Sequence, residues 1–149
     1  MLPPDFINAG RIAHGLEIAS KKRLLETLAR LLATDHPRLE PDLVFERLLE
    51  RERLGSTGLG HGIALPHARM KEVPQSLGAF VSLTHGVDYD AADGEPVDVA
   101  FALLVPETAT EEHLQLLAEL AGRFNDPEVR RQLRHADSAG AVLHIFDAT

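Results

Sequence analysis

Residues 97–124 read VDVAFALLVPETATEEHLQLLAELAGRF, and they contain a predicted strand followed closely by a predicted helix. Its first part, Val97 to Val105, is a short apolar run rich in Val, Phe and Leu, which predicts a buried β-strand. A helix is predicted to begin at Thr110, because Glu111 and Glu112 then occupy its first turn, where acidic side chains favour the helix dipole. The side chains predicted to face inward from this helix are Leu114, Leu117, Ala121 and Phe124. A buried strand that leads into a helix is typical of α/β domains.

The same alternation of strands and helices extends over the rest of the chain. Residues 77–83 form a second apolar run, and the polar segment DYDAADGEP at 88–96 separates the two predicted strands as a loop. The spacing of the leucines after Ser20 predicts an amphipathic helix that this residue caps. The helices predicted outside the opening stretch cover residues 20–35, 42–54, 126–133 and 138–146. The sequence therefore predicts a single α/β domain.

The composition excludes several classes of protein. The chain has 149 residues, no Cys and a formal net charge of -8, so it offers neither disulfides nor a thiolate, and its acidic surface repels nucleic acid. No apolar run is long enough to span a bilayer, and the first residues, MLPPDFINAGRIAHG, do not have the pattern of a secretory signal. We therefore expect a cytoplasmic protein that has protein partners, binds no nucleic acid and does not insert into a membrane.

The segment GSTGLGHGIALPHAR at 55–69 contains the strongest candidate for a reactive side chain. IAL predicts a short strand and Pro66 excludes a helix, so His67 is expected where that strand meets a glycine-rich loop. A histidine near its ordinary pKa is largely neutral at pH 7, and one ring nitrogen then keeps a lone pair that can attack phosphorus. His67 is therefore a candidate nucleophile that accepts a phosphoryl group.

Possible donors to a phosphorylated His67 lie close to it in the sequence. Ser56 and Thr57 offer hydroxyl groups, the glycines allow backbone N–H groups to approach closely, and Arg51 at the end of the preceding helix offers a guanidinium group. The alternative remains open that Ser-Thr-Gly is ordinary turn chemistry without a ligand.

His113 is a second candidate, in the first turn of the helix predicted from Thr110. It lies at the edge of the apolar face, near the positively polarised end of the helix, where a neutral imidazole and a nearby anion are both favoured. The alternative is a partly buried histidine that is hydrogen bonded to a carbonyl group. Spacing alone does not pair His113 with His67.

Other ligands fit the sequence poorly. The glycine cluster lacks the Lys-Ser/Thr of a Walker loop and leads into a strand, so nucleotide binding is not expected. Asp88 and Asp90 match the first and third positions of a calcium loop, but Ala92 stands at the fifth. His61 and His67 do not have the i, i+4 spacing of metal-binding histidines on a helix, so they are only weak evidence for a metal site. We predict neither a metal site nor a cofactor.

Two longer stretches together resemble a known family. RERLGSTGLGHGIALPHAR at 51–69 and DYDAADGEPVDVAFALLVPETATEEHLQLL at 88–117 are similar to the EIIA family of the bacterial phosphotransferase system, fructose–mannitol class, and especially to its nitrogen-related branch. The resemblance extends from about Gly10 to near the C-terminus and includes SKKRLLE in the first predicted helix. It implies one type-2 EIIA domain over residues 1–149, with a core at about residues 10–146 and a mixed β-sheet flanked by helices on both sides.

The resemblance also implies roles for the candidate residues. His67 matches the histidine that is phosphorylated on Nε2, and His113 matches the second active-centre histidine, which contacts the phosphoryl group. Arg51 matches the family's arginine just before the Ser-Thr-Gly stretch. Ser56 and Thr57 match the loop hydroxyls that bind phosphate.

The function implied by the resemblance is that of a phosphoryl carrier. It would receive the phosphoryl group in line from an HPr-type (NPr) phosphocarrier, without a metal or nucleotide at this step. The nitrogen-related branch implies a regulatory role toward targets such as potassium-transport or sensor-kinase components. Two alternatives stay open: a sugar-transport EIIA component that passes the phosphoryl group to an EIIB domain, and a binding module of the same fold that no longer exchanges phosphate. The family often has Asn where this chain has His61, so His61 is not expected to belong to the site.

Overall fold

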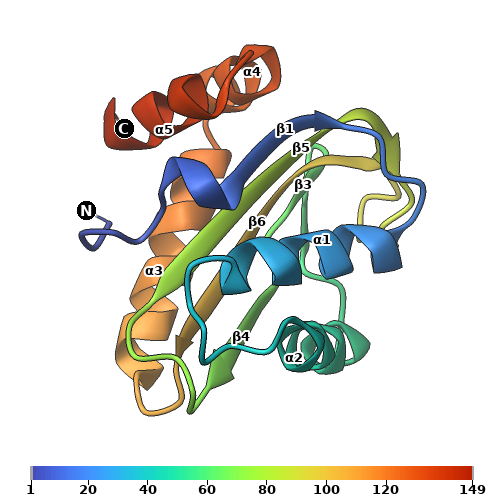
Figure 1. Cartoon of the computed structure of the whole chain (residues 1–149). Coiled ribbons are helices and arrows are strands. Elements are labelled where there is room, and N and C mark those ends of the chain that lie inside the picture. The colour runs from blue at the N-terminus through green and yellow to red at the C-terminus, as the bar shows by residue number, and fades with distance from the viewer. Residues whose placement is uncertain (1, 149) are drawn as a thin grey trace.

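A six-stranded mixed sheet lies between two layers of helices in the computed structural model, which describes residues 2–148 (Figure 1). The strands are β1 (Ile12–Leu16), β2 (Gly58–Gly60), β3 (Ile63–Ala64), β4 (His67–Met70), β5 (Leu77–Val87) and β6 (Val97–Pro106). The helices are α1 (Lys21–Ala33), α2 (Pro41–Arg53), α3 (Thr110–Phe124), α4 (Pro127–His135) and α5 (Ala139–Ala148), and a 3-10 turn covers Ala9–Arg11. This arrangement confirms the predicted α/β class; the two ends of the predicted domain, Met1 and Thr149, lie outside the described residues.

The strand order places β4 beside the central strand β6. The longest strands, β5 and β6, are antiparallel neighbours, with β1 parallel to β5 and β2 antiparallel to β3. Both β3 and β4 pair in parallel with β6, β3 at Val99 and Ala100 and β4 from Leu103 to Pro106. Because β4 pairs with the last residues of β6, His67 with Leu103 and Met70 with Pro106, the start of β4 lies beside the part of β6 that leads into α3.

Apolar side chains fill the spaces on both faces of the sheet. One core lies beneath α1 and α2, and a second lies beneath α3, α4 and α5 on the opposite face (Figure 1). The second core contains a group of phenylalanine rings whose centroids are 5.2 to 6.1 Å apart, a range in which aromatic pairs attract each other. Its members are Phe80, Phe101, Phe124 and Phe146. The helix layers thus hold the sheet that positions the candidate residues.

Most predicted elements occur within a few residues of their expected limits. Ser20 caps α1 by accepting a hydrogen bond from the Arg23 N–H at 3.2 Å, and Asp126 caps α4 by accepting from Glu128 N–H at 2.9 Å. The strand expected at 77–83 continues to Val87 as β5. Three short strands, β1, β2 and β4, were not predicted from the sequence.

The prediction that Leu114 faces inward is wrong, because its side chain is 69% exposed. The buried residues of α3 are Leu116, Leu120 and Phe124, which are spaced four apart and form one stripe along the helix. Leu114 precedes this stripe by two residues, and two residues correspond to a rotation of about 200° around a helix axis. It therefore lies on the solvent side.

His67 begins a strand instead of ending one. The expected strand IAL is present only as β3, Ile63–Ala64, and Pro66 follows it before β4 starts at His67. Proline has no N–H to donate to a neighbouring strand, so the pairing with β6 is interrupted there. The connection between β3 and β4 consequently consists of Leu65 and Pro66 alone, and the candidate nucleophile follows it directly.

A buried arginine fastens the N-terminal segment to the sheet. Arg11 is 1% exposed, and its Nη1 lies 2.6 Å from Oδ2 of Asp35. Its other nitrogens donate to backbone carbonyls: Nη2 to Asp5 and Phe6, and Nε to Gly78. A side chain that cannot donate would leave these carbonyl groups without a partner.

Replacing Arg11 by Met is therefore expected to lower the free energy of unfolding by about 3 kcal/mol. Urea denaturation followed by circular dichroism measures the change. Arg30→Met is the matched control: Arg30 is exposed on α1, so its loss should shift the free energy of unfolding by at most about 0.5 kcal/mol. Equal effects of the two substitutions would contradict the anchoring role of Arg11.

Candidate active site

His67 and His113 come together in the structure although they are far apart in the sequence. Their ring centroids are 5.3 Å apart, and the ring planes are inclined at 75°. His67 starts β4 and pairs with Leu103 of β6, while His113 lies in the first turn of α3, which begins at Thr110 shortly after β6 ends at Pro106. The register of β4 on β6 thus produces a pairing that sequence spacing does not predict.

A hydrogen bond within the β3–β4 connection orients the His67 ring. Its Nδ1 lies 2.8 Å from the carbonyl oxygen of Leu65. A carbonyl oxygen only accepts, so Nδ1 carries the proton, and in the neutral ring Nε2 keeps the lone pair. Burial lowers the pKa of His67 and Arg51 adds to this effect, whereas the Leu65 hydrogen bond and Glu52 oppose it. At neutral pH His67 is therefore an uncharged imidazole whose nucleophilic atom is Nε2.

The ring of His113 is also held neutral. Burial, together with the nearby His67, Arg69 and Arg51, lowers the pKa of His113 to about 4. Its Nε2 is buried and has no hydrogen-bond partner among the described residues, so this nitrogen is not bonded to a carbonyl as the alternative interpretation supposes. A buried polar atom without a partner costs about 1–3 kcal/mol. A ligand oxygen beside the ring would remove that cost.

An open cavity of about 580 Å³ lies in front of the two rings. Its lining includes Arg47, Glu50, Arg51, Leu54, Arg69 and Glu107 besides the two histidines. Arg51, in the last turn of α2, donates from Nη1 to the carbonyl oxygen of Gly55 at 2.9 Å, which ties this arginine to the glycine-rich loop. Three arginines therefore surround the histidines of an otherwise acidic protein, an arrangement that suits a doubly negative group.

The two loop hydroxyls have different surroundings. Ser56 is exposed, and its Oγ accepts a hydrogen bond from the Gly58 N–H at 3.1 Å, which leaves its own proton free to donate. Thr57 is buried, and its hydroxyl donates to the carboxylate of Glu52 and lies 3.0 Å from the Tyr89 hydroxyl. The single proton of Thr57 is thus committed to Glu52 in this structure. Phosphate binding by the Thr57 hydroxyl stays a prediction.

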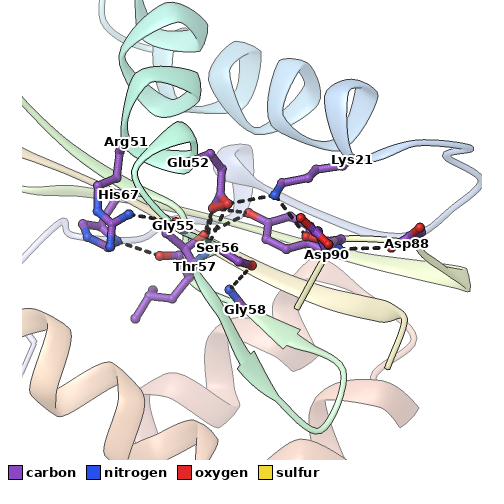
Figure 2. Close-up of polar contacts among 12 residues, drawn as sticks. Lys21, Arg51, Glu52, Gly55, Ser56, Thr57, Gly58, His67, Asp88 and Asp90 are labelled. Carbon is purple, nitrogen blue, oxygen red and sulfur yellow. Dashed lines mark hydrogen bonds and ion pairs between the residues drawn. The ribbon is translucent and has the colours of Figure 1, made fainter. Parts of the chain in front are cut away.

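Sequence reasoning missed Glu52 and Tyr89, which are both buried close to the loop. A signal for Glu52 was present, because it follows Val44 and Leu48 at intervals of four residues and so continues the buried stripe of α2. Tyr89 gave no comparable signal, since it stands within the polar segment at 88–96. Figure 2 shows Glu52 between Lys21 and the Ser56–Thr57 segment.

Neither Ser56 nor Thr57 is among the residues that line this cavity, and the remaining sequence candidates do not line it either. Asp88 accepts from the Asp90 N–H at 3.1 Å within the loop before β6, as expected for a turn. His61 lies between β2 and β3, where its N–H donates to Asp93 at 3.1 Å. Within residues 2–148 no three His, Asp or Glu side chains are grouped as a metal site would require. No helix in the same range has the length and apolar character needed to cross a membrane.

The lowered pKa of His113 predicts a pH-dependent contribution to stability. Because the pKa of this ring is about 4 in the folded protein and 6.5 as its ordinary value, the unfolded chain binds the proton more tightly between these limits. The neutral His113 ring therefore contributes to the free energy of unfolding above pH 6.5, and this contribution is lost as the pH falls toward 4. Urea denaturation from pH 7 to pH 4.5 should show a steeper loss of stability for the unsubstituted protein than for His113→Gln. Parallel curves would contradict the buried neutral state of His113.

The chain has relatives among known proteins and solved structures. Residues 5–149 match the family described as phosphoenolpyruvate-dependent sugar phosphotransferase system, EIIA 2. The nitrogen regulatory protein of Pseudomonas aeruginosa is 45% identical over 141 residues, which cover 95% of this chain and 92% of that protein. A fructose-specific EIIA component of Haloferax volcanii is 38% identical over 129 residues, 86% of this chain and 83% of that protein. The crystal structure of the nitrogen regulatory protein IIA-Ntr from Neisseria meningitidis has a TM-score of 0.88 and 45% identity, with 94% of this chain and 95% of that chain covered. This chain therefore belongs to the EIIA 2 family of the phosphoenolpyruvate-dependent phosphotransferase system, a family of phosphoryl-transfer components with nitrogen-regulatory and sugar-specific members.

Proposed function

We propose that this protein is a cytoplasmic phosphoryl carrier that accepts a phosphoryl group on Nε2 of His67 from an HPr-type (NPr) phosphocarrier. The observation that carries the proposal is the Nδ1 hydrogen bond of His67 to the Leu65 carbonyl at 2.8 Å, in a cavity shared with His113. This bond leaves Nε2 as the atom with the lone pair. Membership of the EIIA 2 family supports a role in phosphoryl transfer.

The transfer is an in-line exchange between two imidazole rings. The lone pair of His67 Nε2 forms a bond to phosphorus while the N–P bond of the donor's phosphohistidine breaks, and the donor ring leaves with that electron pair. Positive charge develops on the His67 ring as its bond to phosphorus forms. The Leu65 carbonyl, which already accepts from Nδ1–H, stabilises that charge without having to move.

The surrounding donors hold the phosphoryl oxygens during the exchange. His113 offers its buried Nε2, Arg51 offers a guanidinium group, and Ser56 offers a hydroxyl proton. Thr57 contributes a hydroxyl to the same site only after exchanging its bond to Glu52, so in the form described here it supports the loop. Backbone N–H groups of the loop and the positively polarised end of α3 add further stabilisation of negative charge.

The proposed role of the phosphorylated state is regulatory. The relatives from Pseudomonas aeruginosa and Neisseria meningitidis are both named nitrogen regulatory proteins, and this supports a regulatory role. The targets that we propose for this role are proteins such as potassium-transport or sensor-kinase components. A second candidate function is that of a sugar-transport component that passes the phosphoryl group to an EIIB domain. The fructose-specific EIIA relative from Haloferax volcanii favours this alternative.

One reconstitution tests both functions. The protein is incubated with radiolabelled phosphoenolpyruvate, Enzyme I and an HPr-type carrier, and we expect one acid-labile, alkali-stable phosphoryl group per chain. Omission of the carrier is the control and should prevent labelling. A fructose- or mannitol-type EIIB domain is then added to the labelled protein. Retained label supports the regulatory role, rapid loss of label to EIIB supports the sugar-transport role, and absence of any labelling would contradict the proposal.

A further inference from the structure

One buried carboxylate joins four segments of the chain beneath the glycine-rich loop. Glu52 is 7% exposed, and its Oε1 accepts from the Thr57 N–H at 3.0 Å and from the Thr57 hydroxyl. The Tyr89 hydroxyl donates to the same oxygen at 3.0 Å. Nζ of Lys21 lies 2.9 Å from Oε2. The dashed lines around Glu52 in Figure 2 show this convergence.

The contacts of Glu52 connect to His67 through two hydrogen bonds. The carbonyl oxygen of Thr57 accepts from the Leu65 N–H at 2.9 Å. The carbonyl oxygen of Leu65 then accepts from Nδ1 of His67 at 2.8 Å. A displacement of Thr57 therefore moves the peptide whose carbonyl orients the His67 ring.

The neighbouring residue on α2 holds the other end of the same loop. Arg51 donates to the carbonyl oxygen of Gly55 at 2.9 Å, while Glu52 binds both the N–H and the hydroxyl of Thr57. The last turn of α2 thus fixes the loop at two points, one facing the cavity and one facing the core. Two bonds from one carboxylate to Thr57 fix the orientation of that residue as well as its position.

We propose that Glu52 is a positioning residue for phosphoryl transfer, which acts through Thr57 and the Leu65 carbonyl to keep His67 in the Nδ1–H tautomer. The effect on transfer rests on the proposed function, whereas the tautomer is a property of the unphosphorylated protein. A contribution to stability alone does not require this side chain, because apolar residues of similar volume often replace a buried ion pair without loss of stability. Orientation of Thr57, by contrast, requires an acceptor for both of its donors.

The first experiment measures the His67 tautomer by ¹⁵N NMR of the full-length, unphosphorylated protein at pH 8, and compares it with Glu52→Gln. Gln keeps the size of the side chain but has only one acceptor oxygen, and if that oxygen turns to the Lys21 ammonium group, the two Thr57 donors face an NH₂ group that cannot accept. We expect one protonated Nδ1 in the unsubstituted protein and a mixture of both tautomers in the variant.

The second experiment measures the rate of phosphoryl transfer from the HPr-type carrier. At saturating carrier the rate for Glu52→Gln should fall about 10-fold, because small misplacements of a reacting group have effects of this size or larger. The carrier concentration that gives half the maximal rate should not change, since Glu52 is buried and lies outside the cavity lining. A general loss of folded protein would not produce this separation of the two parameters.

Asp98→Asn is the matched control for both experiments. Asp98 is a carboxylate that pairs with Arg134 at 2.9 Å, and Arg134 also donates to the carbonyl of His61 at the far end of the β2–β3 hairpin. The control therefore loosens the same hairpin with the same kind of substitution, away from the Leu65 carbonyl. We expect it to keep both the tautomer and the transfer rate of the unsubstituted protein.

Several results would overturn the inference. They are an unchanged tautomer in folded Glu52→Gln, an unchanged transfer rate together with a changed tautomer, or equal changes in Asp98→Asn. If Glu52→Gln does not fold, Tyr89→Phe is measured in its place. This variant removes one hydrogen bond to Glu52, so it should shift the His67 tautomer in the same direction by a smaller amount. An unchanged tautomer in Tyr89→Phe would then overturn the inference. If the unsubstituted protein accepts no phosphoryl group, the proposed function fails, and the tautomer measurement alone decides the role of Glu52.

Discussion

His67→Ala is expected to abolish the incorporation of phosphate from an HPr-type carrier. The substitution removes the cavity ring whose Nε2 keeps the lone pair, because Nδ1 of that ring donates to the Leu65 carbonyl. The measurement is the amount of acid-labile, alkali-stable label after incubation with radiolabelled phosphoenolpyruvate, Enzyme I and the carrier. We expect the label to fall below detection while the circular dichroism spectrum stays unchanged, because the His67 side chain is only half-buried.

The control for this loss is His144→Ala. His144 is an exposed histidine on α5, a helix on the sheet face opposite α1 and α2, so its removal changes the same residue type without touching the cavity. It should be labelled as fully as the unsubstituted protein. Phosphate that persists on His67→Ala, with the stability of a phosphohistidine, would show that another residue accepts the phosphoryl group.

His113→Ala is expected to slow phosphoryl transfer by about 100-fold in both directions, a typical loss when one preorganised donor to a developing charge is removed. Both directions are affected because the forward and reverse reactions share one transition state. Rapid-quench measurements of transfer from the carrier and back to it give the two rates. The protein should remain folded, since the core contacts of α3 are made by Leu116, Leu120 and Phe124.

Partial rescue distinguishes a donor role of His113 from a packing role. His113→Gln retains an N–H donor on a side chain of similar reach, so its transfer rate should lie between those of His113→Ala and the unsubstituted protein. His113→Leu retains apolar volume but no donor and should resemble His113→Ala. Transfer by His113→Ala at the unsubstituted rate in both directions would exclude His113 from the active centre.

The sequence was sufficient for the elements whose signals are local. The strand from Val97 to Val105 and the helix from Thr110 were both predictable, because a buried strand appears as a continuous apolar run and a helix start as acidic residues in its first turn. β1 was not predictable: IAHGL is five residues long and includes His14 and Gly15, which interrupt an apolar pattern. Its strand conformation depends on parallel pairing with β5, and such pairing is not visible in a single segment.

The candidate site shows the same division between local and non-local information. His67 could be selected from its place beside Pro66 and the glycine-rich loop, whereas its proximity to His113 depends on the register that pairs it with Leu103. Glu52 lies among charged residues in ERER at 50–53, the end of α2, although its spacing from Leu48 places it on the buried side of the helix. A charged residue is usually exposed, but hydrogen bonds from Thr57 and Tyr89 and the ion pair with Lys21 offset the free-energy cost of burying the Glu52 carboxylate.

The most direct test of the account is to determine which nitrogen carries the phosphoryl group. Protein labelled with ¹⁵N in its histidines is phosphorylated through the HPr-type carrier, and the coupling between ³¹P and the ring nitrogens is recorded by NMR. We expect coupling to Nε2 of His67, with Nδ1 still carrying the proton that it donates to the Leu65 carbonyl. Coupling to Nδ1, or to a nitrogen of any other histidine, would contradict it.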